Sequence, residues 1–113
     1  DLSARAIREA KVGFMWAAQH HKAFAQVAAV RKKLGVRTIF NALGPLTNPA
    51  GARRQLMGVY DRALCEPLAK ALSELGAVHA WIVAGADGLD ELTTTDISHV
   101  AEVKNGRVQS FTV

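Results

Sequence analysis

Residues 55–84 read QLMGVYDRALCEPLAKALSELGAVHAWIVA, and this stretch decides the fold. Residues 55–60 are predicted to form a strand, and residues 79–84 form a second apolar run of strand length. Between them, leucines recur every three to four residues, as on one face of a helix: Leu64, Leu68, Leu72 and Leu75. Strand, helix and strand within about 30 residues make a βαβ unit, whose strands run parallel. The stretch therefore predicts an α/β fold with a mainly parallel sheet and flanking helices.

The ends of the central helix and a C-terminal hairpin are also predicted. Pro67 lacks a backbone N–H and is tolerated only in a first turn, so the helix should begin near Ala63. Gly76 follows the last leucine and is predicted to cap the helix C-terminus. Residues 99–113 alternate in polarity around Asn105-Gly106, which predicts a β-hairpin with a two-residue turn.

The first half of the chain is predicted to be helical. Three helices are predicted, over residues 2–11, 22–34 and 38–43, and in residues 22–34 the apolar side chains recur at spacings of three to four. Residues 44–51 contain two glycines and two prolines and are predicted to form a loop. Asn41 and Asn48 are expected to bond backbone groups around that loop rather than to perform chemistry.

Composition narrows the class of protein. The chain has 113 residues, half of them hydrophobic, which is enough for one globular domain. No apolar run approaches the ~18 residues of a membrane span, and no signal-peptide pattern is found at the start. The single cysteine, Cys65, excludes an internal disulfide and fits a reducing cytoplasm.

The charge balance indicates anionic ligands. The net charge is +4, but the basic residues are not confined to one patch and few aromatic residues are interleaved with them. Grooves for single-stranded nucleic acid combine basic and aromatic side chains, so anionic small molecules are favoured over nucleic acid.

A glycine-rich acidic loop follows the second predicted strand, at residues 85–91, GADGLDE. Ligands of open α/β sheets gather at the carboxyl ends of the strands, which is where this loop begins. Adjacent carboxylates such as Asp90 and Glu91 can both face a hard cation such as Mg²⁺. A solvated acidic turn is the alternative interpretation.

Two long motifs resemble a known family. Residues 30–50, VRKKLGVRTIFNALGPLTNPA, closely resemble the signature of the anthranilate phosphoribosyltransferase family. Residues 88–91, GLDE, resemble the magnesium-binding motif of that family, and residues 14–21 resemble the segment that precedes the signature. The similarity covers nearly the whole chain, in consistent order.

The resemblance implies transfer of phosphoribose from phosphoribosyl pyrophosphate to anthranilate, in the cytoplasm, as a step of tryptophan biosynthesis. By motif match, Asp90 and Glu91 would hold Mg²⁺ on the pyrophosphate, Arg31 would bind the anthranilate carboxylate and His21 would line the anthranilate path. The full-length protein is expected to be a homodimer with no membrane partner.

The resemblance also implies that residues 1–113 are a fragment of a large α/β domain of the nucleoside phosphorylase/phosphoribosyltransferase type. The Gly-Thr-Gly-Gly-Asp loop and the N-terminal helical domain of that family are not among these residues. The fragment alone is therefore expected to be inactive. A pyrimidine nucleoside phosphorylase-like enzyme and a non-catalytic nucleic-acid-binding relative are the alternatives.

Overall fold

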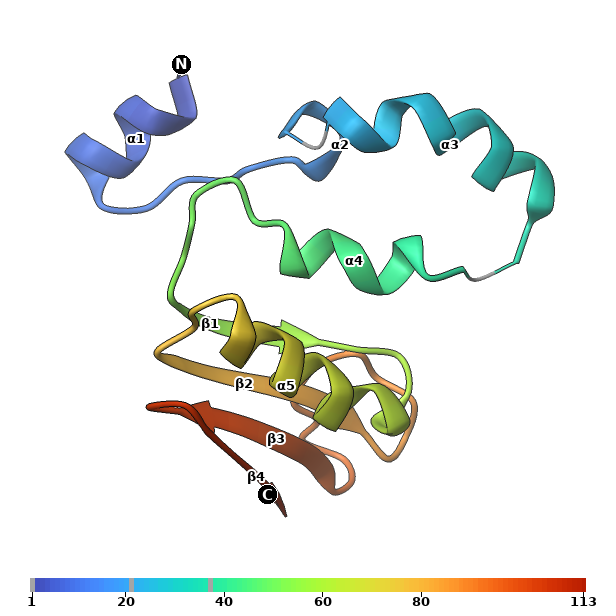
Figure 1. Ribbon diagram of the computed structural model, residues 1–113, viewed down its shortest axis with the longest axis vertical. Helices are drawn as coiled ribbons and strands as arrows, with labels where there is room; N and C mark the ends of the chain where they lie inside the picture. Colours follow the sequence, from blue (N-terminus) through green and yellow to red (C-terminus); the bar gives the residue numbers. More distant parts are fainter. Residues whose placement is uncertain (1, 21, 37) are drawn as a thin grey trace. The chain divides into compact units, whose positions relative to one another are not determined.

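The computed structural model describes residues 2–20, 22–36 and 38–113 (Figure 1). The chain divides into two compact units, Asp1–Gly44 and Pro45–Val113. We call the first the helical unit and the second the sheet unit. In the part of the chain that the structure describes, no helix is long and apolar enough to cross a membrane.

The first half of the chain is helical, as predicted. Its helices are α1 (Leu2–Ala10), α2 (Ala17–His20), α3 (Lys22–Leu34) and α4 (Phe40–Leu46). The predictions for residues 2–11 and 22–34 are confirmed. Gly35 follows α3 with a φ of 62°, a left-handed conformation that glycine adopts without steric cost.

The helix predicted over residues 38–43 lies further along the chain. It runs over Phe40–Leu46 and so extends into residues that were predicted to be a loop. Pro45 lies inside this helix and has no N–H to donate to the carbonyl four residues earlier, and the helix ends one residue later. The two asparagines bond the backbone as predicted: Asn41 Oδ1 accepts from Thr38 N at 2.9 Å, and Asn48 Oδ1 accepts from Ala50 N at 3.0 Å.

The sheet is mixed, and the prediction of a mainly parallel sheet is wrong. It has the order β1-β2-β3-β4, formed by Arg54–Gly58, His79–Gly85, Ser98–Lys104 and Arg107–Thr112. Only β1 and β2 run parallel; β3 is antiparallel to β2, and β4 is antiparallel to β3. The reason is that one βαβ unit supplies one parallel pair, while the hairpin adds its two strands in antiparallel order beside β2.

The crossover helix of the βαβ unit begins and ends as predicted. Asp61 caps a short 3-10 turn (Arg62–Leu64) by accepting from Ala63 N at 2.9 Å. Helix α5 (Cys65–Glu74) follows directly and contains Pro67 in its first turn. Gly76 comes just after the helix with a φ of 89°.

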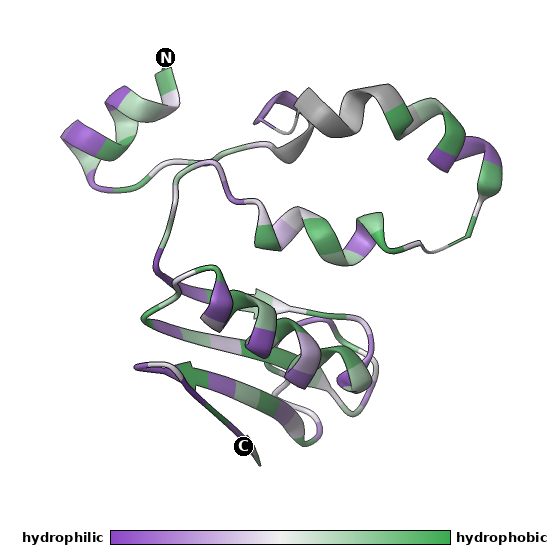
Figure 2. Cartoon of the chain, viewed as in Figure 1, coloured by the Kyte–Doolittle hydropathy of each residue, from purple (hydrophilic) through white to green (hydrophobic). Residues whose placement is uncertain are grey.

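The core of the sheet unit lies between α5 and one face of the sheet (Figure 1). Helix α5 is amphipathic (Figure 2) and buries its apolar side: Cys65, Leu68, Ala69 and Leu72. Facing strands contribute side chains that are fully or almost fully buried, including Ala80, Ile82, Ala101 and Val103. Burial of apolar surface stabilises a fold by about 25 cal/mol per Å², so this contact is the main source of stability in the sheet unit.

A hydrogen-bonded carboxylate lies on β3, beside β2 and β4. Glu102 is 7% exposed and accepts from Trp81 Nε1 at 2.9 Å and from Gln109 Nε2 at 2.6 Å. His79 Nε2 lies 2.8 Å from the same carboxylate. These hydrogen bonds, of which the one from Trp81 contributes most, lower the pKa of Glu102 to about 2. The ring of Phe111 meets that of Trp81 edge-on, with centroids 5.4 Å apart.

The C-terminal hairpin is confirmed. Strands β3 and β4 pair from Lys104↔Arg107 outward, with Asn105 and Gly106 as the two turn residues. Both have positive φ, 51° and 77°, as a type I′ turn requires.

Candidate functional site

The acidic loop lies at the carboxyl end of β2. This strand ends at Gly85, and the loop returns the chain to β3 at Ser98. Asp90 and Glu91 are adjacent and exposed near its middle. The structure thus brings these two predicted residues together on one loop, at the edge of the parallel pair where the topology predicted chemistry.

Asp87 organises the first half of this loop. Its Oδ2 accepts from Thr93 Oγ1 at 2.5 Å and from Thr95 Oγ1 at 2.8 Å, and its Oδ1 accepts from Leu89 N at 3.2 Å. The hydrogen bonds from the two hydroxyls, of which the one from Thr93 contributes most, hold the pKa of Asp87 below its ordinary value. Asp87 therefore acts as a structural acceptor inside the loop.

Backbone bonds close the base of the loop. Gly85 N donates to Leu89 O at 2.8 Å, and Ala86 N donates to Ile97 O at 2.8 Å. Thr93 N donates to the hydroxyl of buried Ser98 at 2.9 Å. These bonds hold the loop on both sides of the acidic pair.

Asp90 and Glu91 present two exposed carboxylates on the acidic loop. Among residues 2–20, 22–36 and 38–113, no group of three or more His, Cys, Asp or Glu could hold a metal ion. Mg²⁺ is commonly bound through one or two carboxylates, with substrate phosphates and water completing its shell. The donor set of Asp90 and Glu91 fits that mode of binding, in which the protein supplies only part of the shell.

Arg31 lies in the last turn of α3, in the helical unit. It is half-buried, and its Cζ lies 5.9 Å from the centroid of the Phe40 ring. A guanidinium over an aromatic face is held by a cation–π interaction. The N–H donors lie in the plane of the guanidinium, so stacking is compatible with a bidentate bond to a carboxylate. His21, the other predicted substrate residue, lies outside the described residues.

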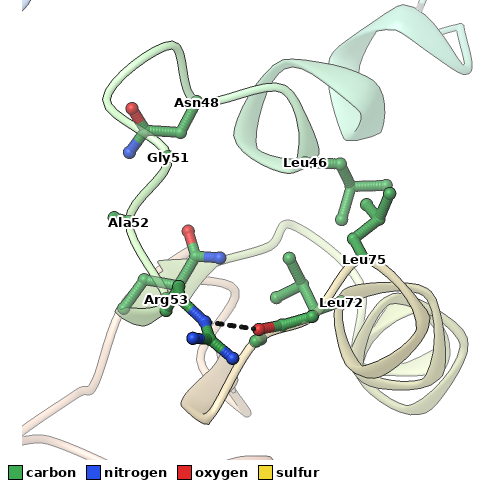
Figure 3. Close-up of a pocket in the computed structure, with 10 residues that line it drawn as sticks. Leu46, Asn48, Gly51, Ala52, Arg53, Leu72 and Leu75 are labelled. Atoms are coloured by element: carbon green, nitrogen blue, oxygen red, sulfur yellow. Dashed lines mark hydrogen bonds between the residues drawn. The ribbon is translucent and has the colours of Figure 1, made fainter.

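A pocket of about 110 Å³ lies elsewhere in the sheet unit (Figure 3). Leu46, Leu72 and Leu75 form its apolar part, and Arg53 Nε donates to Gly76 O at 3.1 Å across it. A cation is favourable beyond a helix C-terminus, so Arg53 has a structural role there. Arg31, Asp90 and Glu91 do not line this pocket.

Comparison with known proteins assigns the family. The family described as "Glycosyl transferase family, a/b domain" matches residues 1–113, the whole chain. The chain belongs to this family. The α/β fold and the acidic loop described above are therefore those of a glycosyl transferase α/β domain.

Several curated relatives carry one name. The anthranilate phosphoribosyltransferase of Methanosarcina mazei is 57% identical over 117 residues, covering 100% of this chain and 31% of the relative. That of Rhodospirillum rubrum is 56% identical over 112 residues, covering 99% of this chain and 32% of the relative. The chain thus spans about a third of the length of the curated relatives it matches.

Solved structures of the Saccharomyces cerevisiae anthranilate phosphoribosyltransferase are also similar. The complex with 4-fluoroanthranilate has a TM-score of 0.75 at 32% identity, covering 82% of this chain and 26% of that chain. The complex with PRPP and Mg has a TM-score of 0.73 at the same identity and coverage. The relationship to the glycosyl transferase family thus extends to the three-dimensional fold.

Sequence reasoning missed the supporting residues of this glycosyl transferase domain. The role of Asp87 was not predicted, although threonines six and eight residues later were a weak signal for a side-chain clasp. The stacking of Phe40 on Arg31 was also missed, because it joins residues of two helices whose packing the sequence does not specify.

Proposed function

We propose that this chain is part of an enzyme that transfers phosphoribose from phosphoribosyl pyrophosphate to anthranilate, a step of tryptophan biosynthesis. The observation that carries the proposal is the exposed Asp90–Glu91 pair at the carboxyl end of β2, in a chain 57% identical to a named anthranilate phosphoribosyltransferase. In the reaction, the amino nitrogen of anthranilate forms a bond to C1 of the ribose, the bond to pyrophosphate breaks, and the amine loses a proton.

The acidic pair serves the leaving group in this proposal. Mg²⁺, when bound, neutralises charge on pyrophosphate and makes it a better leaving group. Asp90 and Glu91 would hold the ion from the protein side, and the phosphates would complete its shell. The clasp around Asp87 supports this role because it restrains the chain beside the pair.

The basic residue of the helical unit serves the acceptor. Arg31 would bind the anthranilate carboxylate through two parallel N–H donors, a geometry that a lysine cannot offer. Its stacking on Phe40 supports the proposal because a restrained guanidinium loses less freedom when it binds. His21 is proposed to line the anthranilate path.

The setting in the longer protein is proposed as well. Residues 1–113 are proposed to be a fragment of a large α/β domain. The full-length protein is proposed to be a homodimer in the cytoplasm that also contains the phosphate-binding glycine loop. The 113 residues alone are proposed to be inactive, because positioning of both substrates supplies much of the rate.

The test uses the full-length protein that contains this chain. Arg31→Ala should weaken anthranilate binding by about 1.5–3 kcal/mol, the worth of a charge-assisted hydrogen bond, and leave phosphoribosyl pyrophosphate binding nearly unchanged. Lys33→Ala, on the same helix turn, is the matched control and should change neither constant. Equal weakening of both substrates, or an unchanged anthranilate constant, would contradict the role of Arg31.

A second pair of variants tests the metal assignment. Asp90→Asn with Glu91→Gln should cut turnover steeply at saturating anthranilate, while Glu74→Gln, an exposed carboxylate on α5, should not. Product formation is followed by chromatography over a range of Mg²⁺ concentrations. Wild-type turnover in the double variant would remove the metal role from this pair.

A further inference from the structure

Gly58, the last residue of β1, lies directly against the acidic loop. A Cβ placed on Gly58 would overlap the carbonyl oxygen of Asp90, lie 2.6 Å from the carbonyl carbon and lie 3.4 Å from Glu91 N. Gly58 is not among the glycines with positive φ, so its backbone conformation is open to any residue. The position thus needs glycine for space rather than for backbone freedom.

The parallel pairing of the sheet creates this contact. Gly58 is in register with Val83 of β2, and the next residue, Val59, donates its N–H to Val83 O at 2.9 Å. The carboxyl ends of β1 and β2 therefore lie side by side. The loop that leaves β2 passes over the end of β1, and the Asp90 carbonyl occupies the space that a side chain would fill.

The hydrogen bonds described for the loop leave a gap at the acidic pair. They hold Gly85, Asp87 and Leu89 on one side, and Thr93 to Ser98 on the other. The contact with Gly58 falls between these two anchored segments, at Asp90 itself. It therefore sets how close the backbone of the pair lies to the sheet.

We propose that Gly58 is a positioning residue for the Asp90–Glu91 pair, acting through the backbone carbonyl of Asp90; this rests on the proposed function of the pair. Any side chain at position 58 pushes the Asp90 backbone outward, since a methyl carbon and a carbonyl oxygen cannot overlap. Residues that support metal ligands typically change metal affinity 10–100-fold when altered. Gly58 thereby decides whether the two carboxylates can share one ion with pyrophosphate.

The experiment compares full-length variants by direct binding. Mn²⁺ is titrated in the presence of inorganic pyrophosphate and followed by electron paramagnetic resonance, which does not depend on turnover. Gly58→Ala should weaken Mn²⁺ binding roughly tenfold to a hundredfold. Gly106→Ala is the control: its φ of 77° makes alanine strained, but nothing lies within 4 Å of the new methyl. It should lower stability and leave Mn²⁺ binding unchanged.

A cycle with the carboxylates decides how Gly58 acts. If it works through the pair, Gly58→Ala should add little to Asp90→Asn with Glu91→Gln, since coupled residues are not additive. A full additional loss, or parental Mn²⁺ binding by Gly58→Ala beside a weakened pair variant, would overturn this proposal alone. Parental binding by the pair variant would overturn the metal assignment and this proposal with it.

A measurement on the unaltered protein covers the case in which Gly58→Ala does not fold. With ¹³Cα-labelled glycine, addition of Mg²⁺ and pyrophosphate should shift the Gly58 resonance, because the Asp90 carbonyl against it responds to occupancy of the pair. The Gly106 resonance should stay in place. A stationary Gly58 resonance under saturating Mg²⁺ and pyrophosphate would contradict the proposal.

Discussion

The sheet unit and the helical unit differ in how far their apolar side chains are buried. Every residue that is buried in the described part of the chain lies between Met57 and Val103, in the sheet unit. Among the described side chains of residues 2–44, none is buried, and Phe14 and Ile39 are 83% and 68% exposed. The two units are similar in hydrophobic content but not in the core that it forms.

This difference in burial implies that the two units are stabilised by different kinds of contact. In the sheet unit, α5 and the strands enclose a shared layer of buried apolar side chains. In the first half of the chain, α1 and α4 have nine and seven residues, and isolated helices below about 12–15 residues are marginal in water. The contacts found there are local ones, such as the hydrogen bond from Thr38 N to Asn41 Oδ1 and the stacking of Arg31 on Phe40.

The largest effect on the free energy of unfolding is expected from a matched pair of Ile→Ala substitutions, one in each unit. Ile82→Ala removes a fully buried side chain and should lower the free energy of unfolding of the 113-residue chain by about 2–5 kcal/mol. Ile39→Ala makes the same chemical change at an exposed site and should cost less than about 0.5 kcal/mol. Urea unfolding followed by circular dichroism measures both. Similar losses for the two variants would break the distinction between the units.

Acid should act on the sheet unit through Glu102. Its folded pKa of about 2 is below the ordinary value of 4.5, so its stabilising effect is complete above pH 4.5 and is lost as the pH falls toward 2. Glu102→Gln should be less stable at pH 7 and should lose stability less steeply on acidification. The melting temperature of each protein between pH 6 and pH 2.5 tests this. Parallel curves for the two proteins would show that other carboxylates dominate.

The smallest effect is expected at Phe40, in the helical unit. Phe40→Leu keeps an apolar side chain but removes the aromatic face under Arg31, and cation–π contacts contribute about 0.5–1 kcal/mol at exposed sites. In the full-length protein this should raise the anthranilate KM a few-fold with little change in kcat, and Phe40→Trp should restore it. A fall in kcat at constant KM would instead indicate a role outside acceptor binding.

Local signals in the sequence predicted most elements of this fold. The helix over residues 22–34 and the turn at Asn105-Gly106 follow from periodicity and turn chemistry, both of which act over a few residues. The direction of β3 against β2 depends instead on whether the connecting loop returns the chain antiparallel or carries it to the opposite end of the sheet. That choice is made by packing over the whole unit, so the mainly parallel sheet was a wrong prediction.

The candidate site divides along the same line. The βαβ topology predicted that Asp90 and Glu91 follow the end of a strand. The two residues lie together because they are adjacent in the sequence. The need for glycine at position 58 arises from a contact with residue 90, thirty-two positions away along the chain, which only the assembled sheet reveals. The hydrogen bonds to the Glu102 carboxylate were missed for the same reason, since the donors come from two other strands.

The two tryptophans of the chain stand one in each unit, which makes the protein its own optical reporter. Trp16 is 60% exposed, whereas Trp81 lies edge-on to Phe111 with its indole N–H on a carboxylate. Emission from Trp16 should be red-shifted and accessible to iodide, and emission from Trp81 should be blue-shifted and shielded. Loss of order in either half would then appear as a separate spectral change, without any added dye or label.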